Sequence, residues 1–175
     1  MNTSIVLTIM ADDQPGIIQT VSSTLHKHGG SWTQSSMSSL AGQFAGILLA
    51  SVPSENSTAC RKELHGLESQ GLRVIARICD QADQADQAEE THEYSLDLVG
   101  NDRVGIVHEV TTVLANHKVN VKSLETVVEA ASMGGGEIFK TSAELLVPEG
   151  TDIDTLEDDI ESLANDLMVA ISFES

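Results

Sequence analysis

Aromatic side chains and cysteines are scarce in this sequence of 175 residues. It has one Trp, one Tyr, three Phe and two Cys. A hydrophobic core must therefore be built from Ile, Leu, Val, Ala and Met, which suits compact units of helices and strands. Cys60 and Cys79 are too few for a disulfide framework and lack the spacing of a metal site, so we interpret them as ordinary reduced thiols.

Long apolar runs are also missing. No stretch approaches the roughly 18 consecutive apolar residues that span a bilayer. The N-terminal segment MNTSIVLTIMADDQ has no basic residue ahead of its apolar ones, unlike a secretory signal. These absences predict a cytoplasmic protein with no membrane partner.

Basic residues are few: nine Lys and Arg stand against 27 Asp and Glu, giving a formal net charge of -18. Residues 1–79 carry five acids and five bases, whereas residues 94–175 carry sixteen acids and four bases. Nucleic-acid affinity comes largely from cations that neutralise phosphates. This composition therefore argues against direct DNA binding, and an anionic membrane surface would repel the chain for the same reason.

An acidic segment divides the chain. Residues 80–93, DQADQADQAEETHE, carry six acids, no Lys or Arg and no large apolar side chain. Such a segment cannot bury a face of its own. It is therefore interpreted as a linker between a first domain at residues 1–79 and a second at residues 94–175.

The two predicted domains share a repeat. DDQPGI at residues 12–17 recurs as NDRVGI at residues 101–106, after a shift of 89 positions. Before each loop, apolar residues alternate as in a strand, and after it they follow helical spacing. The strand positions are Ile5, Leu7 and Ile9, and Tyr94, Leu96 and Leu98. The helix positions are Ile17, Ile18, Val21 and Leu25, and Ile106, Val107, Val110 and Leu114.

A hairpin, a second helix and a last strand complete each copy. The hairpins are predicted to turn at residues 41–43 and 133–136, where glycines permit a positive φ. Thr151 and Asp152 are candidate caps for the final helix. The order βαββαβ occurs twice, which predicts an α+β fold of two ferredoxin-like domains. Each would have a four-stranded antiparallel sheet with two helices on one face.

Each repeated loop is expected to begin a helix. Pro15 suits the first helical position, Asp13 could cap the free backbone N–H groups, and Gly16 leaves room for a neighbouring strand or a small ligand. Asp102 and Gly105 repeat the arrangement. The loops could be nothing more than good helix starts. Alternatively, free N–H groups beside an aspartate would suit an α-amino acid zwitterion.

The strand, the Asp-x-Pro-Gly-Ile loop, the helix and the hairpin resemble the ACT domain, a regulatory module that often binds amino acids at domain interfaces. The paired arrangement is similar to the glycine cleavage system transcriptional repressor family. This resemblance implies ligand contacts from the two loops and from the polar residue that opens each second strand. In the first domain these residues are Asp13, Gln14, Gly16, Ile17 and Ser31. In the second domain they are Asp102, Arg103, Gly105, Ile106 and Asn120. Ser31 departs from the usual Asn and is followed by the bulky Trp32, which favours the second domain as the ligand site.

Other residues that could carry chemistry have simpler explanations. His28 and His117 are expected to lie at helix C-termini, where an imidazole meets the helix dipole favourably. Cys60 and His65 are five residues apart on one predicted helix and do not face each other, so no catalytic site, metal site or cofactor is predicted. The acidic run at residues 152–161 covers apolar residues at helical spacing, which favours a solvated helix face over a cation site. A docking surface for a basic partner stays open as an alternative.

The leading hypothesis is a non-enzymatic regulator that responds to an amino acid such as glycine. The resemblance implies that it contacts a DNA-binding transcription regulator and does not itself bind DNA. A homo-oligomer is compatible with this interpretation. Two alternatives stay open at this point: a detached sensory module of an enzyme such as a phosphoserine phosphatase, and a structural dimerisation module that binds nothing.

Overall fold

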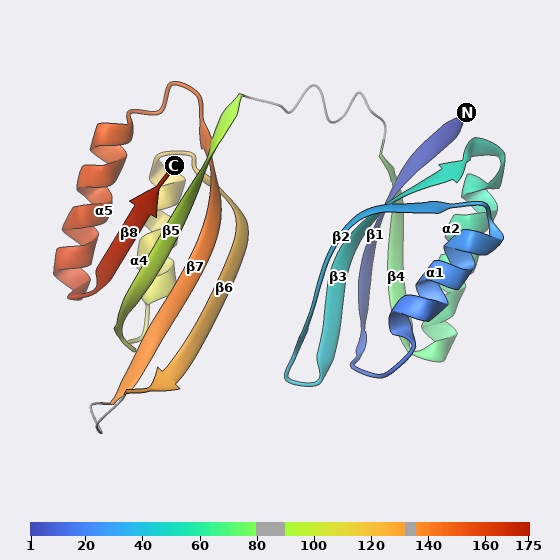
Figure 1. Cartoon of the computed structure of the whole chain (residues 1–175), viewed down its shortest axis with the longest axis horizontal. Helices are drawn as coiled ribbons and strands as arrows, with labels where there is room; N and C mark the ends of the chain where they lie inside the picture. Colours follow the sequence, from blue (N-terminus) through green and yellow to red (C-terminus); the bar gives the residue numbers. More distant parts are fainter. Residues whose placement is uncertain (80–89, 132–135) are drawn as a thin grey trace. The chain divides into compact units, whose positions relative to one another are not determined.

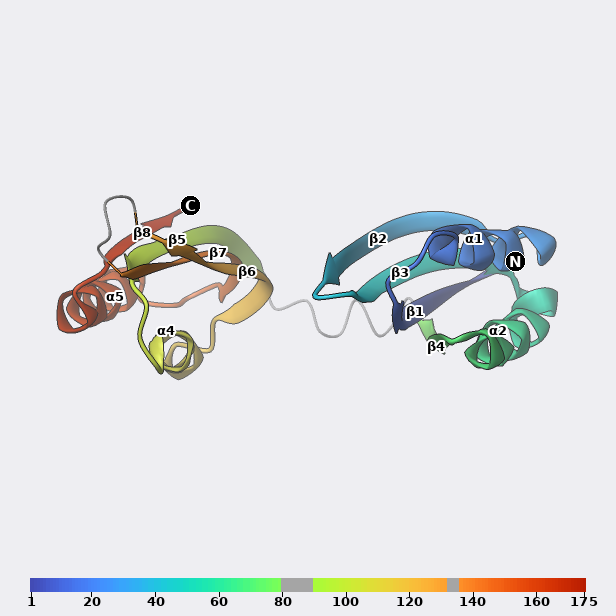
Figure 2. The same cartoon turned by 90° about the horizontal axis from the view of Figure 1, so that it is seen from below.

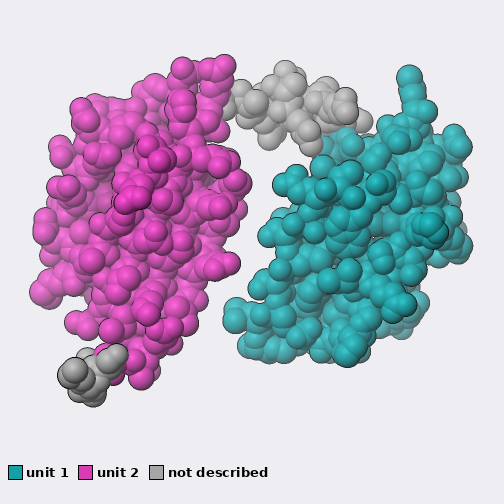
Figure 3. All heavy atoms as spheres, in the orientation of Figure 1, with its two compact units in different colours: residues 1–87 teal, residues 88–175 magenta. Residues whose placement is uncertain are grey.

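The computed structural model describes residues 1–79, 90–131 and 136–175. The chain divides into two compact units, residues 1–87 and residues 88–175 (Figures 1 and 3). None of the helices in the described ranges is long and apolar enough to cross a bilayer.

The first unit is a four-stranded antiparallel sheet with two α-helices. Its elements are β1 (Asn2–Asp12), α1 (Ile17–Lys27), β2 (Ser31–Leu40), β3 (Gln43–Pro53), α2 (Ser57–Gly66) and β4 (Leu72–Cys79). Short 3₁₀ turns, η1 (Ser54–Asn56) and η2 (Leu67–Gln70), flank α2. The strand order is β2-β3-β1-β4. Strand β3 therefore lies between β1 and β2, as in a split βαβ unit.

The second unit repeats this plan. Its elements are β5 (Thr91–Asn101), α4 (Ile106–Asn116), β6 (Asn120–Ala130), β7 (Glu137–Pro148), α5 (Ile153–Leu167) and β8 (Ala170–Glu174). The strand order β6-β7-β5-β8 matches that of the first unit, and every pair is antiparallel. The predicted α+β fold of two ferredoxin-like domains is confirmed.

Both helices of each unit cover the same face of its sheet (Figure 2). The alternating apolar residues of the first strand point into this layer, with Ile5, Leu7 and Ile9 buried in one unit and Leu96 and Leu98 in the other. Burying a Leu or Ile side chain contributes about 1.5–3 kcal/mol, so each unit has its own stabilising core. No helix of the described residues lies on the opposite face of either sheet.

The first hairpin turns where the sequence indicates. Ala41 and Gly42 both have positive φ, 50° and 79°, as a two-residue turn between twisted strands requires. Most of the second predicted turn, residues 133–135, lies outside the described residues. Strand β5 begins at Thr91, earlier than the expected start at Tyr94, because Thr91–Glu93 continue the ladder opposite Pro148–Leu146.

The predicted helix ends also have clear structural counterparts. Asp152 is the N-cap of α5, where its Oδ1 accepts a hydrogen bond from the Thr155 backbone N–H at 3.2 Å. This bond holds the pKa of Asp152 below its ordinary value. His28 and His117 are the C-cap residues of α1 and α4, as expected. The acids Asp154, Asp158 and Glu161 are exposed above the buried Leu156 and Ile160.

Candidate functional site

The two repeated loops have the same backbone geometry. Gly16 and Gly105 are the N-cap residues of α1 and α4, each with φ 97°, and no side chain caps either helix start. The expectation that Asp13 and Asp102 cap these helices is therefore wrong. Pro15 likewise precedes the N-cap and does not fill the first helical position. Because a glycine occupies each cap position, no cap side chain accepts from the first helical N–H groups, which also lack an intrahelical partner.

A glycine is required here by the backbone conformation. A Cβ on Gly16 would meet no atom within 4 Å, and one on Gly105 would meet only the Glu109 side chain at 3.4 Å. No strand in the described part of the chain packs closely against either glycine, so one of the two expected reasons for the residue does not apply. An L-residue other than Gly rarely adopts φ 97° because its Cβ clashes with its own backbone.

The two aspartates differ in their surroundings. Each donates its backbone N–H to the hairpin next to it, Asp13 to the Gly42 carbonyl and Asp102 to the Glu137 carbonyl, both at 2.9 Å. The Asp13 carboxylate also accepts a hydrogen bond from the Ser39 hydroxyl at 2.5 Å. The residue equivalent to Ser39 is Val128, and the Asp102 carboxylate has no hydrogen-bond partner among the described residues. Only the second loop thus presents an unoccupied carboxylate.

Arg103 is already engaged within its own loop. Its guanidinium Nη2 donates to Glu109 Oε1 at 2.6 Å, and both side chains are partly exposed. The equivalent positions in the first unit are Gln14 and Thr20, which cannot form such an ion pair. A ligand carboxylate would therefore have to compete with Glu109 for Arg103. The sequence did not indicate this pair, although a Glu six residues after an Arg at a helix start is a visible pattern.

Within each unit, Ser31 and Asn120 lie far from the loops. Asn120 is in register with Leu146 and, across β7, with Glu93, whereas Asp102 follows the opposite end of β5. Eight residues along a strand separate these ends, a distance of about 26 Å. Ser31 has the same relation to Asp13. The loop and the opening residue of the second strand are thus not brought together inside a unit.

Beside the second loop runs an apolar groove between α4 and β6, which sequence reasoning missed. Ile106, Val107 and Thr111 line it from the helix, and Val121 and Leu124 line it from the strand. The first unit has Ser35 and Ser39 where the second has Leu124 and Val128, so its corresponding edge is polar. The glycine loop of the first unit instead borders an open depression of about 160 Å³, which is lined by Gln14, Gly16, Gln19, Gln70 and neighbouring residues.

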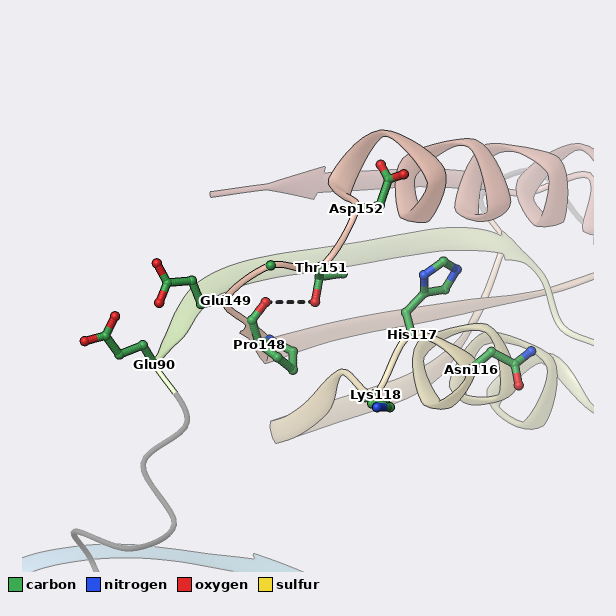
Figure 4. Close-up of a pocket in the computed structure, with 9 residues that line it drawn as sticks. Glu90, Asn116, His117, Lys118, Pro148, Glu149, Thr151 and Asp152 are labelled. Carbon is green, nitrogen blue, oxygen red and sulfur yellow. Dashed lines mark hydrogen bonds between the residues drawn. The ribbon is translucent and has the colours of Figure 1, made fainter.

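A larger open cleft of about 560 Å³ lies at the opposite end of α4, between its C-terminus and the start of α5 (Figure 4). Its charged groups do not converge. Figure 4 shows the Glu90 and Glu149 carboxylates turned away from His117, and Thr151 donates its hydroxyl to the Pro148 carbonyl at 2.8 Å. This cleft is therefore a weaker candidate than the loops.

The two C-cap histidines connect the helices of their units. His28 Nε2 lies 2.9 Å from Glu63 Oε2, and His117 Nε2 lies 2.7 Å from Asp159 Oδ2. Lys27 Nζ lies 2.8 Å from Glu63 Oε1, and the hydrogen bonds from Lys27 and His28 lower the pKa of Glu63. Both histidines are accounted for by helix ends and helix pairing.

Cys60 and His65, the two residues considered for catalysis, have different surroundings. Cys60 is buried, which raises the pKa of its thiol, and His65 is exposed on the same helix. Within the described ranges, no three His, Cys, Asp or Glu side chains are grouped as metal ligands.

Comparison with known proteins agrees with this geometry. Models of the ACT domain match residues 3–76 and residues 88–165. The chain belongs to the ACT domain family. Two ACT domains in tandem account for most of its length and include both glycine loops.

Two solved structures match the tandem arrangement over nearly the whole chain. A structure described as an "Unknown Protein from Galdieria sulphuraria" is 25% identical with a TM-score of 0.87, covering 99% of this chain and 98% of its own. A protein described as a "putative glycine cleavage system transcriptional repressor" is 20% identical with a TM-score of 0.66, covering 99% and 97%. No curated protein matches the sequence.

Proposed function

We propose that this tandem ACT protein is a non-enzymatic regulator that binds a free amino acid and acts through protein contacts. The observation that carries the proposal is the second glycine loop. There, uncapped N–H groups at the start of α4 lie in the same loop as an unoccupied aspartate carboxylate. These two features are the complements of an α-carboxylate and an α-ammonium group.

The electrostatics of the loop favour such a ligand. The N-terminus of a helix carries a partial positive charge and free N–H donors, which stabilise a carboxylate. Asp102 would pair with the ammonium group, and Arg103 could exchange Glu109 for the ligand carboxylate. The corresponding aspartate of the first unit is occupied by Ser39, so we assign the principal site to the second unit.

Asn120 can contact the proposed ligand only if two ACT units share the binding site. Because it lies about 26 Å along the sheet from Asp102 in its own unit, it could contact the same ligand only from a different ACT unit. A ligand held in this way would favour one packing of the units over another, by its difference in affinity for the two arrangements. Such coupling is how binding of a small molecule would be transmitted to a partner.

The fold similarity to the protein described as a glycine cleavage repressor makes glycine the first ligand to test and a DNA-binding transcription regulator the first partner. The strongly acidic second unit suits a partner with a basic surface, since opposite charge speeds encounter. The same charge disfavours direct contact with DNA.

Thermal unfolding in the presence of each of the twenty amino acids tests ligand binding. A cognate amino acid at about 100 times its dissociation constant should stabilise the folded protein by roughly 2.7 kcal/mol. An unchanged melting temperature across the panel at millimolar ligand would contradict the proposal.

Gel-shift titration at low salt tests the absence of direct DNA binding. The purified protein should leave a duplex unshifted, and should change the mobility of a complex only when a DNA-binding regulator is present. Saturable, salt-sensitive binding by the protein alone would contradict the adaptor role.

A further inference from the structure

The face of the first sheet that carries no helix is unusually apolar. Alternation along the strands places Val6, Met10, Ile47, Leu49 and Ile75 on it, and we call these five residues the apolar face. Met10, Ile47 and Ile75 are 49%, 58% and 48% exposed. Val6 and Leu49 are partly buried beside them, and the exposed Thr8 lies between Ile47 and Ile75. A cluster of apolar side chains from two central strands and one edge strand is typical of an interaction surface.

The equivalent face of the second sheet is polar. The residues in register there are Ser95, Val99, Ser142, Glu144 and Ser172. Asp97, Glu125 and Glu174 share that face and add further negative charge. Since the same fold tolerates a fully solvated face, the apolar residues of the first unit are not required by the sheet itself.

The edges of the apolar face are polar in a complementary way. Strand β4 presents Arg73 and Arg77 on one edge, and strand β2 presents Gln34, Ser36 and Ser38 on the other. Arg73 also donates to Glu68 at 3.3 Å in an exposed ion pair, so a group across the dimer would share this arginine with Glu68. The strand order β2-β3-β1-β4 matters here. A two-fold axis parallel to the strands and between two such sheets would place β1 over β3 of a second copy, and β4 over β2.

We propose that the apolar face binds the same face of a second copy, giving a dimer of face-packed sheets. In this arrangement apolar side chains of β1 meet those of β3, and the arginines meet hydroxyl and amide oxygens. The other in-plane two-fold axis, perpendicular to the strands, would set Arg73 and Arg77 against their own copies. Two-fold interfaces require a self-complementary surface, which only the first arrangement provides.

The second unit does not offer the same contact. Pairing its open face with itself would gather Asp97, Glu125, Glu144 and Glu174 from both copies in one interface. Lys122, which lies 3.6 Å from Glu144, and Lys140 offset only part of this negative charge, so like charges would still oppose the contact. The dimer is therefore assigned to the first unit alone. This inference does not depend on amino-acid binding and would survive its failure.

Sedimentation equilibrium of the full chain tests the dimer, with two equivalent substitutions as a matched pair. Met10→Asp lies on the apolar face, and Val99→Asp lies at the same position of β5, where Val99 is 44% exposed. We expect Met10→Asp to weaken dimerisation by at least about tenfold, equivalent to 1.4 kcal/mol, and Val99→Asp to leave it unchanged. Circular dichroism melting of both variants shows that each remains folded.

Ser38→Asp tests the orientation by a gain of affinity. Ser38 and Arg73 lie on opposite edges of one sheet, about 14 Å apart, so a new ion pair between them can form only across the dimer. The variant should dimerise about two- to fivefold more tightly at low salt, a gain within the range of exposed ion pairs. Ser38→Lys should weaken the dimer.

Three results would overturn the proposal. The chain could be a monomer at every concentration, which would leave the apolar face to another occupant. The dimer could persist in Met10→Asp, or it could dissociate in Val99→Asp. Unchanged association in both Ser38 variants would reject the axis parallel to the strands.

Discussion

The two ACT units share a backbone plan but differ in what their surfaces offer. Both have the left-handed glycine at the start of the first helix, the C-cap histidine and the same strand order. In the first unit, residues 1–79 have a neutral charge balance, the open sheet face is apolar, and the Asp13 carboxylate accepts a hydrogen bond from Ser39. The second has an acidic sheet face, an apolar groove beside α4 and an open aspartate.

This difference indicates that the loop backbone and the side chains around it serve separate purposes. The repeated φ of 97° belongs to the fold, because it occurs in both units whatever surrounds it. The side chains next to the loop decide whether its polar groups are left for a ligand. In the first unit these neighbours are Ser39 and Thr20, and in the second they are Val128 and Glu109. We interpret the second unit as the ligand-binding unit and the first as the unit that contacts a second copy of the chain.

The largest effect is expected from substitutions in the hydrophobic cores of the two units. Leu7→Ala and Leu96→Ala remove equivalent buried side chains, and each should destabilise its own unit by about 2–5 kcal/mol. Scanning calorimetry should show one transition lowered and the other retained, because each unit has its own core. If both variants lower the whole unfolding profile equally, the units form one cooperative structure and the comparison fails.

A smaller effect is expected at the loop glycines. Gly16→Ala and Gly105→Ala should each cost roughly 1–2 kcal/mol in the free energy of unfolding, because a Cβ disfavours a left-handed backbone. Gly66→Ala is the matched control, since Gly66 has φ -64° and open space around it. Urea unfolding that finds the Gly66 variant equally destabilised would show that backbone strain is not the cause.

The smallest effect is the acid response of the helix pairs. The lowered pKa of Glu63 means that its carboxylate stabilises the folded state above its ordinary range and that this contribution is lost as pH falls through the lowered value. Glu63→Gln should therefore lower the free energy of unfolding of the first unit at neutral pH. It should also reduce how steeply that free energy falls as the pH becomes acidic. Glu55→Gln, at an exposed site in η1, should leave that slope unchanged. An identical slope in both variants would contradict the assignment.

Much of the fold could be read from the sequence because its signals are local. The strand pattern depends only on the alternation of Ile5, Leu7 and Ile9, and the helix pattern only on the spacing of apolar residues after Gly16. The repeat shows both patterns a second time, which supports each prediction. The loop geometry was less accessible. The pattern Asp-x-Pro-Gly permits several caps, and only the backbone shows that the glycine, not the aspartate, occupies the cap position.

The surroundings of the site could not be predicted, because they depend on strand register. Ser39 meets Asp13 only because β2 returns alongside the loop, and Leu124 lines the groove only because a bulge between Val121 and Ser123 shifts β6. The apolar face likewise emerges from the pairing of Val6 with Leu49 and of Thr8 with Ile47 and Ile75. Each contact joins segments that are distant in the sequence.

Isothermal titration with the amino acid that stabilises the protein most is the direct test of the central claim, that the second loop is the ligand site. Asp102→Ala should weaken binding by about 1–3 kcal/mol, since it removes the partner of the ammonium group, while Asp13→Ala should change it little. Both variants should keep the wild-type circular dichroism spectrum, because neither carboxylate caps a helix. An equal or greater loss from Asp13→Ala, or no saturable heat with any of the twenty amino acids, would contradict the account.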